Sequence, residues 1–171
     1  MAELSPQERL QPALLDRLSD DEPDKKVEGP DKRVLTKGQL RQAVLRDLAW
    51  LFNTTRLESG EDLSSTPLVE KSTLNYGLPA LAGETAASLD PTDLERAVRE
   101  AILAYEPRIL PSSLRVRTIV TETQLDQHNV ISVQIEGFLW AQPVPLELLL
   151  RTEVDLETGR VEITDLARSG A

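Results

Sequence analysis

The hydrophobic pattern of this chain changes its period at Pro111, and that change limits most strongly which folds the chain can adopt. Before Pro111, apolar residues recur every three to four positions over residues 36–52 and 90–106, as on one face of an amphipathic helix. After Pro111 they alternate with polar residues, which is typical of half-buried strands. Helices first and strands later, with short connections between the strands, predict an α+β fold. We expect two main helices packed on a largely antiparallel sheet of about four strands.

Both predicted helices carry start signals. Thr36 and Gln39 form a capping-box pattern at the start of the first helix. Asp90 suits the N-cap of the second helix, and Pro107 ends it because the residue before a proline is driven away from helical geometry. The expected buried stripes are Leu40, Ala43, Val44, Leu48 and Leu51, widened by Trp50 and Phe52, and then Leu94, Ala97, Val98, Ala101, Ile102 and Tyr105.

Four strand segments are expected after Pro111. Their inward-facing residues are Leu114, Val116, Thr118 and Val120; Ile131, Val133 and Ile135; Leu146, Leu148, Leu150, Thr152 and Val154; and Val161 with Ile163. Gly159 lies in a predicted hairpin turn between the last two segments. Residues 54–89 are irregular but rich in leucine, so we expect a loop with short helical turns that packs against the core.

The length of 171 residues suits one domain with tails. We predict an N-terminal arm over residues 1–33, an α+β domain over residues 34–167 and a C-terminal tail over residues 168–171. Leu14, Leu15 and Leu18 give the arm a short amphipathic segment, and a charged connector over residues 19–33 follows it. This segment either lies in a groove of a partner or folds back on its own domain.

The composition excludes several classes of function. Acidic residues outnumber basic ones by 29 to 19, which disfavours nonspecific binding to nucleic acid. The absence of cysteine excludes disulfides and thiolate metal sites. The first residues do not resemble a signal peptide, and no apolar run approaches the length of a membrane span. We therefore expect no nucleic-acid partner, no membrane insertion and a cytoplasmic location.

The sequence offers little catalytic chemistry. Its single histidine, His128, lies in a predicted surface turn, and a zinc site would have to rely mainly on carboxylates, which are poor zinc ligands by themselves. No glycine-rich phosphate loop and no nucleophile elbow occurs. We expect no metal and no cofactor.

The strongest candidate for acid chemistry is Glu106, because paired carboxylates alone can hydrolyse glycosides. Arg108 stands two residues away and favours the ionised carboxylate, whereas a general acid must hold a proton. The charge pattern therefore argues against a peptidoglycan hydrolase of lysozyme type, which stays the alternative function. That alternative requires cell-wall cleavage that is lost in Glu106→Gln.

Four segments occur in a recognisable order: LLDRLSDDEP, VLRDLAWLFNTTR, STLNYGLPALAG and AILAYEPRIL. Together they resemble the baseplate wedge proteins that initiate the sheath of contractile phage tails, a family that includes the TssE subunits of type VI secretion systems. The resemblance covers residues 14–163. Ala80 departs from it, since the family usually has an acidic residue after NYGLP.

The resemblance implies a structural baseplate component rather than an enzyme. Its implied partners are the wedge proteins TssF and TssG, with TssK attached, and the sheath proteins TssB and TssC. A strand arm of the first sheath ring would add to an exposed edge of the sheet. The implied location is a baseplate docked on the inner membrane, on its cytoplasmic side. A general adaptor unrelated to secretion is a further alternative.

The resemblance also implies a protein-interaction surface. Its Glu-Pro-Arg motif falls on Glu106, Pro107 and Arg108. The remaining candidates are Leu14, Leu15 and Leu18 in the arm and Asn75 and Tyr76 in the NYGLP loop. Two interpretations of the motif stay open: its charges form a clasp that fixes the turn from helix to strand, or they face a partner.

Overall fold

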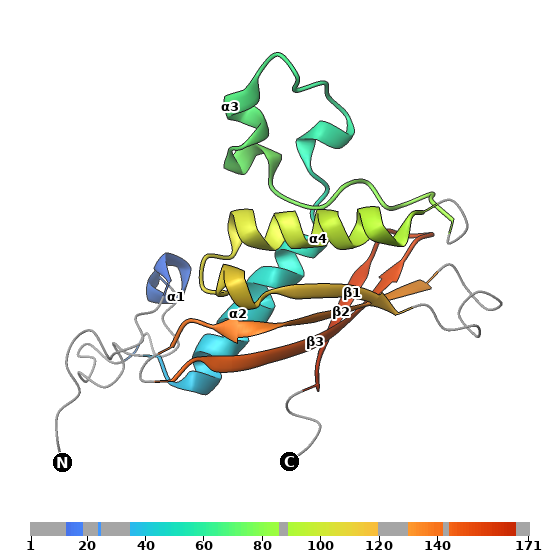
Figure 1. The fold of residues 1–171 in the computed structure, drawn as a ribbon. Helices are drawn as coiled ribbons and strands as arrows, with labels where there is room; N and C mark the ends of the chain where they lie inside the picture. Colours follow the sequence, from blue (N-terminus) through green and yellow to red (C-terminus); the bar gives the residue numbers. More distant parts are fainter. Residues whose placement is uncertain are drawn as a thin grey trace, which may run out of the picture.

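The computed structural model describes residues 13–18, 24, 35–85, 89–119, 130–141 and 144–166. Its two long helices, α2 (Lys37–Phe52) and α4 (Pro91–Tyr105), precede a four-stranded antiparallel sheet. The helices contact each other and the sheet, and they bury their apolar faces in one core (Figure 1). The predicted α+β class is confirmed.

The sheet follows the order of the chain. Its strands are β1 (Arg115–Ile119), β2 (Val130–Leu139), β3 (Leu146–Asp155) and β4 (Val161–Asp165), and neighbours pair antiparallel in the order β1-β2-β3-β4. Gly159 turns β3 into β4 with a φ of 73°. The short strands β1 and β4 are the two edges, so they carry the backbone groups that no neighbouring strand of this sheet can bond.

The helix signals act as the sequence predicts. The Thr36 hydroxyl accepts from the Gln39 N–H while the Gln39 side chain accepts from the Thr36 N–H. The Asp90 carboxylate accepts from the Thr92 N–H, and α4 ends at Tyr105, before Pro107. The expectation is wrong for Trp50, which is 52% exposed. It lies off the apolar stripe, and one face of its ring contacts Arg46, whose guanidinium carbon is 5.3 Å from the ring centroid.

The core between the helices and the sheet is aliphatic. Val44 and Leu48 of α2, Ile102 of α4 and Leu150 of β3 are all completely buried. Full burial of such a side chain stabilises the fold by about 1.5–3 kcal/mol. The core therefore fixes which faces of the helices and the sheet meet, and it leaves the ends of these elements to carry polar sites.

A leucine-rich loop leaves the end of α2 and stands off the domain beyond α4 (Figure 1). We call residues 54–78 the excursion; it contains the 3-10 turns η3 (Leu57–Ser59) and η4 (Thr73–Asn75) and the short helix α3 (Pro67–Glu70). Its two ends are tied together, because Arg56 N–H donates to the Leu78 carbonyl and Leu78 N–H donates to the Thr54 carbonyl, both at 2.8 Å. The expected short helical turns are present, but the expectation that this loop packs against the core is wrong for Leu68 and Leu74, which are 86% and 68% exposed; Leu78, at the base of the loop, is buried in the core.

The N-terminal amphipathic segment appears as α1 (Leu14–Leu18). Residues 1–12, nearly all of the charged connector, His128 and the predicted tail over residues 168–171 lie outside the described residues. The division into arm, domain and tail stays a prediction. No helix in the described part of the chain is both long and apolar enough to span a membrane.

Gly77 closes the neck of the excursion in a conformation that favours glycine, with a φ of 126°. A Cβ placed there would lie 2.2 Å from the Thr54 carbonyl oxygen, whereas a Cβ at Gly60 would meet nothing within 4 Å. We predict that Gly77→Ala lowers the free energy of unfolding by about 2 kcal/mol or more, through strain and steric clash. Urea denaturation should show this loss, and the control Gly60→Ala should leave the midpoint nearly unchanged. Equal stability of the two variants would contradict the assigned role of the neck.

Candidate functional site

The site is built on the corner where α4 passes into the sheet. Glu106 is the C-cap of α4, with φ −121° and ψ 77°, and its side chain turns inward at 3% exposure. Two backbone bonds fasten the following residues to the end of β2. Leu110 N–H donates to the Phe138 carbonyl at 2.8 Å, and Trp140 N–H donates to the Arg108 carbonyl at 2.7 Å. The chain that follows Pro107 is thus fastened to the end of β2.

Glu106 and Arg108 form a two-pronged ion pair across the corner. The Arg108 Nε donates to Glu106 Oε1 at 2.7 Å, and its Nη2 donates to Oε2 at 2.5 Å. The backbone N–H of Arg108 also donates to Oε1, at 3.1 Å. Fork-on-fork contact of this kind is stronger and more directional than a single ion pair. The pair has the geometry that the clasp interpretation requires, and the part of these charges in a protein interface stays a prediction.

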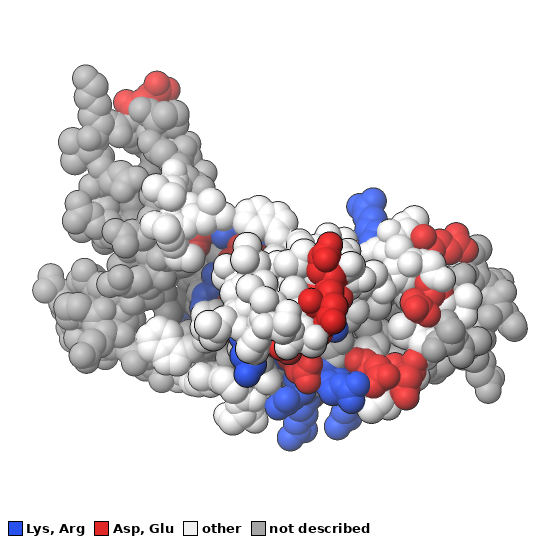
Figure 2. Space-filling view, turned by 90° about the horizontal axis from the view of Figure 1, so that it is seen from above, with Lys and Arg blue, Asp and Glu red and all other residues white. Residues whose placement is uncertain are grey.

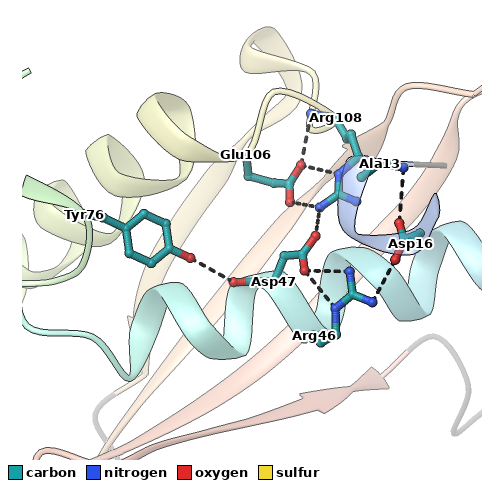
Figure 3. A network of polar contacts seen from close by, with 7 residues as sticks. All are labelled: Ala13, Asp16, Arg46, Asp47, Tyr76, Glu106 and Arg108. Atoms are coloured by element: carbon teal, nitrogen blue, oxygen red, sulfur yellow. Dashed lines mark hydrogen bonds and ion pairs between the residues drawn. The ribbon is translucent and has the colours of Figure 1, made fainter. Parts of the chain in front are cut away.

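Further charges extend this pair across α2 to α1. The Arg108 Nη2 contacts Asp47 Oδ2 at 2.5 Å, Asp47 Oδ1 contacts Arg46 at 2.9 Å, and Arg46 Nη1 contacts Asp16 at 2.7 Å. We call the row Glu106, Arg108, Asp47, Arg46 and Asp16 the charge ladder (Figure 3). Signs alternate along it, so each member between the ends has an opposite charge on both sides. The ladder links α1 to α2 and α2 to the end of α4.

The ladder sets the electrostatics of its arginines. Burial disfavours the charged form of Arg108, but hydrogen bonds and charge from Glu106 and then Asp47 outweigh it and raise the pKa of the guanidinium above its usual value. Arg46 has the same pattern: burial opposes its charge, and hydrogen bonds to Asp16 and Asp47 raise its pKa. Both arginines are therefore permanently charged.

Two tyrosines connect the ladder to the excursion. Their rings meet edge to face, with centroids 5.1 Å apart. The Tyr105 hydroxyl lies 2.9 Å from the Ser72 carbonyl and 3.0 Å from the Asn75 carbonyl, and the Tyr76 hydroxyl donates to the Asp47 carbonyl at 3.4 Å. Burial, followed by the charges of Asp47 and Glu106, raises the pKa of Tyr76. The phenol therefore stays protonated and remains a donor.

A groove of about 540 Å³ runs beside the ladder. Its lining is largely apolar, and the residues that carry this character are Ala13, Trp50, Leu51, Tyr76, Tyr105 and Pro107. Arg108 also lines it, and its Nη1 is a buried atom for which the described residues supply no hydrogen-bond acceptor. The surface that this groove offers to other molecules is therefore mainly its apolar wall.

The arrangement does not suit acid catalysis. Both carboxylate oxygens of Glu106 accept hydrogen bonds from Arg108, so neither is placed to carry a proton to a substrate. Among the described residues, no cluster of three or more His, Asp or Glu side chains could hold a metal ion.

The structure brings some of the predicted interaction residues together and separates others. Glu106 and Arg108 form the ladder, Tyr76 and the exposed Pro107 line the groove beside it, and α1 touches the ladder through Asp16. The arm leucines point largely to solvent: Leu14 is 71%, Leu15 42% and Leu18 74% exposed.

Asn75 lies within the excursion and is only 7% exposed. Its side chain accepts from the Glu58 N–H at 2.9 Å and donates to the Glu70 carbonyl at 3.0 Å. These bonds shape the loop from inside. A part for Asn75 in a protein interface stays a prediction.

The sequence reading missed Asp16, Arg46, Asp47 and Tyr105 as members of the site. Arg46 and Asp47 lie in the segment VLRDLAWLFNTTR, on the side of α2 that does not carry the apolar stripe. An arginine and an aspartate side by side on a helix are usually solvated, so the pattern alone gives no signal that they meet Arg108. Their presence in a family segment is the signal that could have found them.

Comparison with known proteins identifies the family. The sequence model of the family described as baseplate wedge protein gp25 matches residues 38–144, more than half of the chain. The chain belongs to this family. The resemblance to the baseplate wedge family drawn from the four sequence segments is confirmed, and the matched range contains the corner, Arg46 and Asp47, and the excursion.

A solved structure described as the baseplate complex from the type VI secretion system contains a chain that is similar to this wedge-family member. The match covers 69% of this chain and 96% of that one, with 20% sequence identity and a TM-score of 0.44. No match to a curated protein sequence was found.

The clasp predicts a stability effect for Glu106→Gln. The substitution keeps the shape but leaves Arg108 with one carboxylate partner, and removing one member of a buried pair is costly. Because the Arg108 side chain is 21% exposed, we expect a loss at the lower end of that effect, about 2–3 kcal/mol. Urea denaturation measures it, with Glu100→Gln, an exposed site on the same helix, as the control that should change little. A loss no larger than in the control would show that the clasp contributes nothing.

Proposed function

We propose that this protein is a structural component of a type VI secretion baseplate that docks on the wedge and initiates polymerisation of the contractile sheath. The observation that carries the proposal is the family match across residues 38–144, which includes the Glu-Pro-Arg corner. The protein acts in the cytoplasm, at a baseplate docked on the inner membrane. It needs no cofactor, and its partners matter more than any pocket for a small molecule.

The corner supplies the wedge contact. Its ladder fixes the direction of Pro107, while the groove beside it offers apolar surface. We assign this surface, with α1 at its border, to the wedge proteins TssF and TssG, which carry TssK. The clasp and the docking interpretations are then compatible. The ion pair of Glu106 and Arg108 would fix the corner and thereby hold Pro107 and the groove in the orientation that the wedge proteins bind.

The sheet edges supply the sheath contact, by addition of a strand from TssB or TssC. Each edge is partly occupied by a side chain of the same protein. Asn53 bonds both the N–H and the carbonyl of Val161 on β4, at 3.0 and 2.9 Å, and Glu95 accepts from the Thr118 N–H on β1 at 2.6 Å. In an antiparallel ladder outward-facing groups recur at every second residue. Val116 of β1 and Ile163 of β4 therefore direct their own N–H groups outward.

No observation favours the alternative of a peptidoglycan hydrolase. That activity would need Glu106 as a proton donor, and its oxygens are already engaged by Arg108. A non-enzymatic role agrees with a family described as baseplate wedge proteins.

Strand addition predicts that one edge is sensitive to proline. Val116→Pro and Ile163→Pro each remove an outward N–H without removing a bond to the neighbouring strand. In a reconstitution with the wedge and sheath proteins, electron microscopy should show loss of sheath growth from baseplates that carry one of the two variants. Co-purification with the wedge and thermal unfolding control for folding. Normal sheath growth from both folded variants would contradict strand addition.

The arm is tested by truncation. We predict that removal of residues 1–33 weakens co-purification with TssF and TssG, because it removes α1 and the Asp16 contact to Arg46. The matched point variant Asp16→Asn should cause a smaller loss, since a partly exposed ion pair contributes about 1 kcal/mol or less. Unchanged wedge binding after truncation would reduce the arm to a tether.

A further inference from the structure

The excursion has features that neither wedge docking nor strand addition uses. It is a separate, packed unit: η3 and η4 contact each other, and α3 contacts η4. Leu63 is buried inside it at 8% exposure, and Asn75 bridges its two sides. The two backbone hydrogen bonds of the neck and the hydroxyl of Tyr105 hold it on the domain. A loop of this length with its own internal packing is usually functional.

This rigid unit carries leucines on its outside. Leu57 in η3 is 40% exposed, Leu68 in α3 is 86% exposed and Leu74 in η4 is 68% exposed. Leu63 shows that the unit can bury a leucine, so exposure is not forced by lack of an interior. Apolar side chains that are held outward on a fixed frame mark a surface that is completed by a protein partner.

The charged residues of the excursion indicate which kind of partner would bind it. Glu58, Glu61, Asp62 and Glu70 line one hollow of about 320 Å³, together with Leu63 and Ser64. Residues 57–70 contain no lysine or arginine; Arg56 before them is paired with Glu58 at 3.3 Å, and the exposed Lys71 after them is the one further basic residue of the excursion. Figure 2 looks down on this side of the molecule, where both acidic and basic side chains flank uncharged surface. The excursion therefore carries exposed leucines and, on the same packed unit, an acidic hollow.

We propose that the excursion is a docking site for a basic amphipathic helix of another protein. The apolar stripe of that helix would cover Leu68 and Leu74, and its lysines or arginines would lay their aliphatic stems over Leu63 and their charges among the carboxylates of the hollow. The site is distinct from the corner and from the sheet edges. It holds whether or not the protein initiates a sheath.

The test uses the full chain and a synthetic amphipathic helix of leucine and lysine, with a matched helix in which glutamate replaces lysine. Isothermal titration should show binding of the lysine helix that weakens as salt is raised, and no binding of the glutamate helix. Leu68→Ser with Leu74→Ser should weaken binding about tenfold or more, whereas Leu18→Ser, an equally exposed leucine of α1, should not. Because Leu68 and Leu74 are exposed, these variants keep the fold.

A second pair of variants distinguishes the effect of the carboxylates in the hollow from the effect of the net negative charge of the chain. Glu61→Gln with Glu70→Gln should weaken binding severalfold, while Glu100→Gln with Glu153→Gln removes the same charge elsewhere and should leave it unchanged. Equal effects of the two pairs, or no effect of the leucine variants, would overturn the proposal. Sedimentation should show a monomer; self-association that Leu68→Ser abolishes would instead assign the surface to a second copy of this chain and likewise overturn it.

Discussion

The contact between the Arg108 fork and the Glu106 carboxylate is the interaction on which the rest of the structure depends. The hydrophobic core fixes two helices against a sheet and also takes in Ile109 and Leu114 of the passage from α4 to β1, but it leaves the turn at Pro107 itself to polar groups. At that turn a buried carboxylate and a guanidinium lie two residues apart. The proline between them has no N–H, so it can continue neither the helix nor the hydrogen bonding of a strand. Such a pair does not add much net stability, because desolvation offsets most of the attraction. Its effect is to leave the corner only one satisfactory arrangement.

The same guanidinium links the corner to distant parts of the chain. Asp47 reaches it from α2, and through Arg46 and Asp16 the order extends to α1. Tyr76 and Tyr105 continue the connection to the neck of the excursion. The corner, α1 and the excursion therefore share one polar frame that lies outside the aliphatic core. A protein that receives several partners gains from this separation, because surface contacts can be rigid without interrupting the core.

Local signals made much of this fold predictable. The capping residues Thr36 and Asp90, Pro107 and the change of period at Pro111 each act within a few residues, and the structure follows them closely. The site was less accessible to sequence reasoning. Glu106 and Arg108 are neighbours in sequence and could be identified, whereas Asp47 joins them from 61 positions away and only the folded chain brings it there. Trp50 was wrongly expected in the buried stripe for a related reason. Its half-exposed ring contacts the Arg46 guanidinium on one face, and the spacing of apolar residues along the sequence does not reveal such a contact.

Asn53 has a consequence for the protein before it meets any partner. Its amide group presents to Val161 the same donor and acceptor that the peptide group of an adjacent strand would present. Exposed strand edges tend to pair with each other without regard to sequence, which leads to aggregation. Because the Asn53 amide already bonds the N–H and the carbonyl of Val161, an incoming strand would have to replace these two hydrogen bonds and would gain no new ones there. Chance encounters are thereby discouraged, and only a strand that brings further favourable contacts can displace it.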